Sequence, residues 1–136
     1  MVTSQIPIRS ARVLIIEDNV DSADTLARFL RVACGYEASV AYDGARGLAA
    51  AVADPPDVVI CDIAQPKRNG LLVGEEIAET VVPRPLLIAV TAHGEEAITA
   101  LAADAGFDHF LVKPADPFAI EMLSDTHLAA HGSQLW

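Results

Sequence analysis

Polar side chains of the types that bind phosphate and metal ions follow directly on short apolar runs. Glu17 and Asp18 come after the first run, Asp62 after the third, Thr91 after the fourth and Lys113 after the fifth. If the fold brings the three carboxylates together, they repel one another and need a proton or a counter-charge. The Lys113 ammonium is one such charge, and a hard divalent cation such as Mg²⁺, with Mn²⁺ as the alternative, is another. A carboxylate can also act as a nucleophile and carry a phosphoryl group, whose oxygens an ammonium and a hydroxyl can bind.

The apolar runs predict five buried strands. Most of them are continuous rather than alternating, which is typical of strands covered on both faces of a sheet. The runs are Val13–Ile16, Ala38–Ala41 (interrupted by Ser39), Val58–Cys61, Leu86–Val90 and Phe110–Val112.

The segments between these runs have helical spacing. An apolar i, i+3, i+4, i+7 stripe occurs twice, and each predicts a helix with one buried face. The first consists of Ala23, Leu26, Ala27 and Leu30, and the second of Ile98, Leu101, Ala102 and Ala105. Further helices are predicted over Gly44–Ala53, Leu71–Thr80 and Pro117–Leu128, with Asp116 as the N-cap of the last. Gly35 is expected to end the helix that carries the first stripe, and Gly106 the helix that carries the second.

Five strands that alternate with five helices predict an α/β fold with a parallel sheet. The common doubly wound order for five strands is 2-1-3-4-5, the flavodoxin-like arrangement, and ligands bind there at the carboxyl ends of the strands. The order reverses between the first and third strands, and Asp18 and Asp62 come after the ends of these two strands. The sequence therefore predicts a site at this edge of the sheet.

Length and composition limit the class of protein. The 136 residues suit one domain, with a core of about residues 12–128 and flexible ends at 1–10 and 131–136. A net charge of −10 argues against direct binding of nucleic acid. No apolar run is long enough for a membrane span and the first ten residues lack the pattern of a secretory signal, so we expect a cytoplasmic location without membrane insertion. Cys34 and Cys61 match no metal or redox motif and are interpreted as small buried apolar residues.

Taken in order along the chain, these motifs resemble those of response-regulator receiver domains, the CheY-like domains of two-component signalling, including receivers fused to hybrid histidine kinases. The segment Val13–Asn19 resembles the opening of that family, and Asp62–Gly70 keeps its Asp, its Pro four residues on and its Gly eight residues on. Thr91-Ala92 and Lys113-Pro114 match two later motifs, and Phe110 occupies the aromatic position three residues before the lysine. The resemblance extends from about Arg12 to Leu128.

The resemblance implies a role for each acidic residue. Asp62 would be the phosphoacceptor of a two-component system or phosphorelay. Asp18 and Asp62 would contact Mg²⁺ directly, Glu17 would act through water, and the carbonyl of Ala64 would complete the protein ligands. The chain would be no enzyme beyond phosphotransfer to itself and autodephosphorylation at Asp62.

The resemblance also assigns the residues around the phosphoryl group. Thr91 and Lys113 would bind its oxygens, and the peptide bond between Lys113 and its proline is expected to be cis. Thr91 and Phe110 would form the switch that reports phosphorylation. Ala64 and His93 would lie beside the path of the hydrolytic water and set the lifetime of the phosphoryl group. The implied partners are a sensor histidine kinase or a histidine phosphotransfer protein, and a downstream protein target.

Three alternative functions compete with this hypothesis. A haloacid-dehalogenase-type phosphotransferase needs a second Asp two residues after the first, where this chain has Ala64. A nucleotide-binding module needs a glycine-rich phosphate motif after a strand, and the sequence has none. A receiver-like interaction module that works without phosphorylation stays open, although the intact acidic set argues against it. Gln65, Lys67 and Arg68 depart from the family's usual residues and leave the conformation after Asp62 open.

Overall fold

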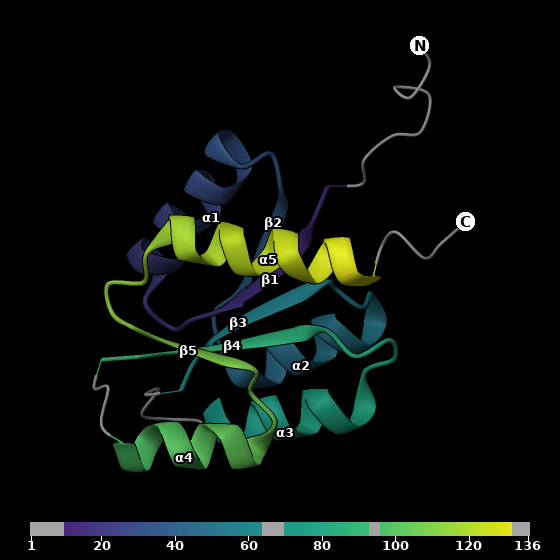
Figure 1. Ribbon diagram of the computed structural model, residues 1–136, viewed down its shortest axis with the longest axis vertical. Helices are drawn as coiled ribbons and strands as arrows, with labels where there is room; N and C mark the ends of the chain where they lie inside the picture. Colours follow the sequence, from purple (N-terminus) through teal and green to yellow (C-terminus); the bar gives the residue numbers. More distant parts are fainter. Residues whose placement is uncertain (1–9, 64–69, 93–95, 132–136) are drawn as a thin grey trace.

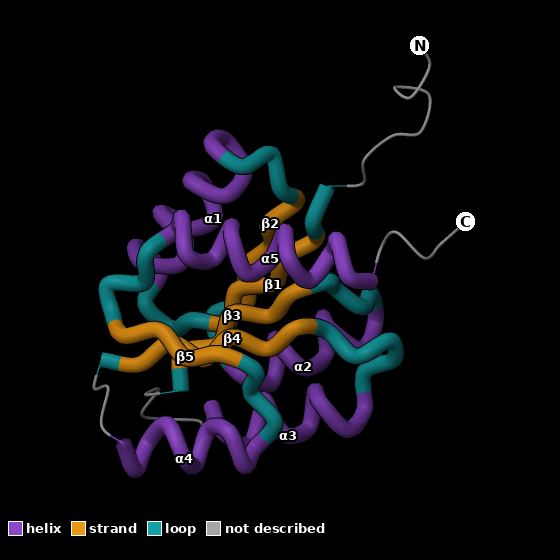
Figure 2. Tube along the Cα trace, in the orientation of Figure 1, coloured by secondary structure: helices purple, strands orange, loops and turns teal. Residues whose placement is uncertain are grey.

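The computed structural model describes residues 10–63, 70–92 and 96–131. In the described part of the chain, five strands alternate with five helices. Figure 1 shows how these elements are arranged in space, and Figure 2 shows the same view coloured by secondary structure. The predicted flexible ends fall almost entirely outside the described residues. The elements are β1 (Arg12–Ile16), α1 (Val20–Ala33), β2 (Glu37–Ala41), α2 (Gly44–Ala53), β3 (Val58–Asp62), α3 (Gly70–Thr80), β4 (Leu86–Thr91), α4 (Glu96–Ala105), β5 (His109–Val112) and α5 (Pro117–His131).

The strands form one parallel sheet in the order β2-β1-β3-β4-β5, which confirms the predicted topology. Ile16 of β1 pairs with Cys61 of β3, so these two neighbouring strands end at the same level of the sheet. Glu17, which follows β1, and Asp62, the last residue of β3, consequently emerge side by side. This register is what brings together two acidic residues 45 positions apart in the chain.

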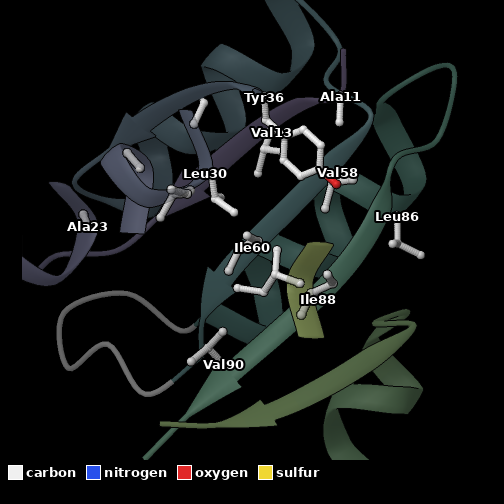
Figure 3. Packing of buried hydrophobic residues seen from close by; sticks show 14 residues of the cluster. Ala11, Val13, Ala23, Leu30, Tyr36, Val58, Ile60, Leu86, Ile88 and Val90 are labelled. Carbon is white, nitrogen blue, oxygen red and sulfur yellow. The ribbon is translucent and has the colours of Figure 1, made fainter. Parts of the chain in front are cut away.

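Each face of the sheet is covered by its own set of helices (Figure 1). One core cluster joins α1 and α5 to strand residues that include Val13, Ile60 and Ile88, and Figure 3 shows this packing. The second cluster joins α2, α3 and α4 to the opposite face, where Cys61 is completely buried. The expected burial therefore holds for Cys61, whereas Cys34 is half-buried at the end of α1. Among the described residues, no helix is both long and apolar enough to cross a membrane.

The helix ends follow their capping residues. Asp116 accepts a hydrogen bond from the Phe118 backbone N–H at 2.9 Å, with Pro117 at the first helical position, as predicted. Gly35 and Gly106 adopt φ of 71° and 105°, the left-handed conformation that glycine accepts most easily and that ends α1 and α4.

Some details differ from the predictions. In α4 the predicted burial of Leu101 is wrong, because this residue is 52% exposed. Ala102 and Ala105 are buried as expected. The small alanines let the helix lie close to its neighbours, and a leucine at the margin of the stripe then points to solvent. Continuous burial holds for β1, β3 and β4 at the centre of the sheet but not for the edge strands β2 and β5. The last helix continues to His131, three residues beyond its predicted end.

Candidate functional site

Three carboxylates meet at the carboxyl ends of β1 and β3. Glu17, Asp18 and Asp62 each place an oxygen within 4.8 Å of the others. Glu17 and Asp62 are buried, at 7% and 5% exposure, whereas Asp18 is exposed. The predicted juxtaposition of Asp18 and Asp62 is therefore present in the structure, and it joins two buried charges to one that faces solvent.

The Lys113 ammonium supplies the counter-charge. Its Nζ donates to Asp62 Oδ2 at 2.7 Å and to Glu17 Oε1 at 2.9 Å. Lys113 follows β5, so its side chain reaches past the end of β4 to these two carboxylates. Its backbone N–H donates to the Thr91 carbonyl at 2.8 Å, and the bond to the following proline is cis, as expected.

The Glu17 carboxylate is held from both sides. Lys113 binds Oε1, and the backbone N–H of Asn19 donates to Oε2 at 3.1 Å. Asn19 is also the N-cap of α1, because its side chain accepts from the Ser22 N–H at 2.9 Å. The start of the helix thus fixes the orientation of the acidic side chain before it.

Burial and neighbouring charges shift the pKa values of Glu17 and Lys113. Burial raises the pKa of Glu17, the neighbouring Asp62 raises it further, and the hydrogen bond from Lys113 only partly offsets this rise. Burial lowers the pKa of Lys113, but its hydrogen bonds to Asp62 and Glu17 outweigh that effect, so the pKa lies above its ordinary value. The ammonium therefore stays protonated at neutral pH.

Thr91 and Phe110 lie near one another on the face of the sheet that α2, α3 and α4 cover. Thr91 ends β4, is 3% exposed and has the same side-chain direction as Ala89, two residues earlier. Ala89 pairs with Phe110 of β5, and the half-buried ring of Phe110 packs against the α2–α4 cluster. The two predicted switch residues are thus close in the sheet, with the ring next to the core beneath α4.

Gly70 is a structural determinant of the site whose contact the sequence interpretation did not foresee. A Cβ built at this position lies 2.6 Å from both the Asp62 carbonyl oxygen and the Ile63 Cα. Only a glycine lets α3 begin this close to the backbone that carries Asp62. The signal in the sequence was its spacing, eight residues after the aspartate.

Cys61 lies directly before Asp62 and contacts the same helix. Its Sγ is 3.8 Å from the Gly70 carbonyl oxygen, and burial raises the pKa of the thiol to about 12. The thiol is therefore protonated and inert at neutral pH.

Two predicted residues, Ala64 and His93, lie outside the described residues, as do Gln65, Lys67 and Arg68. Their proposed roles stay predictions.

The donor set fits a hard divalent cation. All three side chains offer carboxylate oxygens, which Mg²⁺ and Mn²⁺ prefer over softer ligands. Exposed Asp18 leaves the cluster open to solvent, which suits an ion that keeps several of its waters.

Comparisons with known proteins agree with this arrangement. The profile of the response regulator receiver domain family matches residues 13–123. Response regulator MprA of Mycobacterium bovis is 32% identical over 114 residues, which cover 84% of this chain and 47% of that protein. The chain thus spans about half the length of the curated relatives it matches.

Solved structures have the same fold. A putative response regulator from Chloroflexus aurantiacus superposes with a TM-score of 0.80 at 25% identity, covering 89% of this chain and 99% of that one. A response regulator from Burkholderia pseudomallei, solved with a phosphorylated aspartic acid, a calcium ion and citrate, gives 0.77 at 24% identity, covering 92% and 75%. With the family profile covering most of its length, the chain belongs to the response regulator receiver domains.

Proposed function

We propose that this chain is a phosphorylation switch of a two-component or phosphorelay system, with Asp62 as the acceptor. One observation carries the proposal: the Asp62 carboxylate is buried beside two other carboxylates and 2.7 Å from the Lys113 ammonium. Burying two acidic groups around one ammonium, with a third carboxylate beside them, is unfavourable for stability alone, because like charges repel and desolvation is costly. Such a cluster is typical of a functional site.

The proposed reaction is a transfer of one phosphoryl group. A carboxylate oxygen of Asp62 attacks the phosphorus of a phosphohistidine or of a small acyl phosphate. The bond between phosphorus and the donor's nitrogen or oxygen breaks, and the leaving group keeps the electron pair. Lys113 and Thr91 then bind the oxygens of the transferred group, which places the ammonium between Glu17 and the new dianion.

A divalent cation belongs to this proposal. Asp18 and Asp62 would bind Mg²⁺ directly, or Mn²⁺ in its place, with Glu17 acting through water and the Ala64 carbonyl as a further ligand. When bound, the cation neutralises charge that develops on the phosphoryl oxygens. The Burkholderia structure, with its phosphorylated aspartic acid and calcium ion, supports this pairing of chemistries.

The proposed setting is the cytoplasm. A sensor histidine kinase or a histidine phosphotransfer protein would supply the phosphoryl group, and a downstream protein would receive the signal.

His93 and Ala64 would set how long the group persists, with His93 shielding it or orienting the hydrolytic water. Replacing His93 with Ala is then expected to change the decay rate of a radiolabelled phosphoryl group in excess Mg²⁺.

The test is intact-mass spectrometry after incubation with acetyl phosphate and Mg²⁺. The wild-type chain should gain one phosphoryl group, Asp62→Asn should gain none, and Asp104→Asn, which changes an exposed residue of α4, should behave as wild type. Equal phosphorylation of Asp62→Asn would show that another residue is the acceptor. A wild-type chain that is never modified would favour an interaction module that works without phosphate.

A further inference from the structure

A pocket lies on the α1 and α5 side of the sheet, next to the carboxylate cluster. Its volume is about 420 Å³, within the usual range for sites that take small molecules. The strands contribute Ile15, Ile60 and Val90, and α1 contributes Leu26 and Phe29. The opposite wall is the connection from β5 to α5, which includes Pro114 and Ala115.

Contacts with α5 and with the core hold the walls of the pocket in place. The Phe29 ring makes an edge-to-face contact with Phe118 of α5, with centroids 5.4 Å apart and planes at 88°. Val90, Ile60 and Ala23 belong to the core cluster on this face, and all three are labelled in Figure 3. The hollow is therefore framed by packed side chains on the sheet and on two helices.

The charges around the pocket select the sign of a ligand. Asp21, in the first turn of α1, is exposed and lines the pocket, and its carboxylate makes no ion pair or hydrogen bond within the described part of the chain. Glu17 and Asp62 line the same pocket and share the single ammonium of Lys113. Without a divalent cation, three carboxylates against one ammonium give the pocket a net negative charge, which favours a cationic ligand over an anionic one.

We propose that this pocket binds a small organic cation whose apolar body fills the hollow and whose ammonium group pairs with Asp21. Apolar walls favour an aromatic or branched aliphatic body, because its burial removes apolar surface from water. Asp21 is the carboxylate available to the head group, since Glu17 and Asp62 already share Lys113. This binding does not depend on phosphorylation and goes beyond the proposed switch.

The test is a titration of the full chain with 2-phenylethylammonium in EDTA, followed by ¹H–¹⁵N NMR. We expect saturable one-to-one shifts at Ala23, Leu26 and Val90, with a dissociation constant of about 1 mM for so small a probe. Asp21→Asn should raise that constant about threefold, as for an exposed ion pair, whereas Asp104→Asn should leave it unchanged. The anion 3-phenylpropionate should bind more weakly than the cation.

A second variant tests the pocket itself. Ala115→Phe places a ring against the wall and should abolish the shifts while the rest of the spectrum stays folded. The proposal is overturned if the cation causes no saturable shifts, if Asp21→Asn binds as tightly as wild type, or if the anion binds equally well. Probe binding that survives in folded Ala115→Phe, or that saturates at one probe for two chains, also overturns it.

Discussion

Removal of the Lys113 ammonium should expose how strongly this one charge holds the site together. Lys113→Met keeps the length of the side chain but leaves the buried carboxylates of Asp62 and Glu17 without their partner at 2.7 and 2.9 Å. Loss of one member of a fully buried pair costs about 3–5 kcal/mol. Because the Lys113 side chain is 33% exposed, water screens part of this interaction, and we expect a loss of about 2–3 kcal/mol in the free energy of unfolding.

A divalent cation should compensate for that loss. In the variant, Asp62 and Glu17 lack the Lys113 ammonium, and they should bind Mg²⁺ more tightly than the wild-type site, where the ammonium competes. A tenfold gain in affinity at saturating Mg²⁺ corresponds to about 1.4 kcal/mol of extra stabilisation of the variant. Mg²⁺ should therefore narrow the difference between variant and wild type.

Urea unfolding in EDTA measures the loss of stability in Lys113→Met, and urea unfolding in excess Mg²⁺ measures how far the cation compensates for it. Arg46→Met is the control, because Arg46 pairs with Asp43 at 3.4 Å where both side chains are exposed, and its loss should cost less than about 0.5 kcal/mol. A cost for Lys113→Met below about 1 kcal/mol in EDTA would refute the reasoning. Equal stabilisation of both proteins by Mg²⁺ would also refute it.

Three further predictions concern the packing of α5, the packing of α3 and the proposed switch. The Ser124 hydroxyl is fully buried and has no hydrogen-bond partner in the described part of the chain, so Ser124→Ala should raise stability by about 1 kcal/mol in urea unfolding, and a loss would contradict this. A Cβ at Gly74 would lie 2.3 Å from the Phe107 ring, so Gly74→Ala should lose about 1–3 kcal/mol despite its better helix propensity, and unchanged thermal unfolding would show that the ring moves freely. Beryllofluoride with Mg²⁺ should shift the NMR signals of Thr91, Phe110 and α4 together if the switch couples them, whereas shifts confined to the site would exclude that coupling.

The sequence was sufficient to predict that Asp18, Asp62 and Lys113 meet at one edge of the sheet, whereas Ala64 and His93 stay predictions. Continuous apolar runs indicated parallel strands, and parallel strands place their following residues at one edge. For that reason Asp18, Asp62 and Lys113 could be assigned to one edge without knowledge of any distance. Asp116 and Gly35 were predictable too, because capping depends on local backbone conformation.

Other features depend on contacts between distant segments. Lys113 binds Glu17 as well as Asp62 because its long side chain extends past the end of β4. The spacing of residues in the sequence does not encode this path. The approach of Gly70 to the Asp62 backbone depends on where α3 begins. Leu101 was misplaced because helical spacing alone does not define the width of a buried face.

The sulfur atom beside the proposed acceptor has a consequence for signalling under oxidative stress. Cysteine oxidation begins from the thiolate, and burial raises the pKa of Cys61 to about 12, so the thiol stays protonated at pH 7. Burial also keeps peroxides away from Cys61. A residue next to Asp62 that could have made the proposed switch sensitive to the redox state of the cell is thereby kept unreactive.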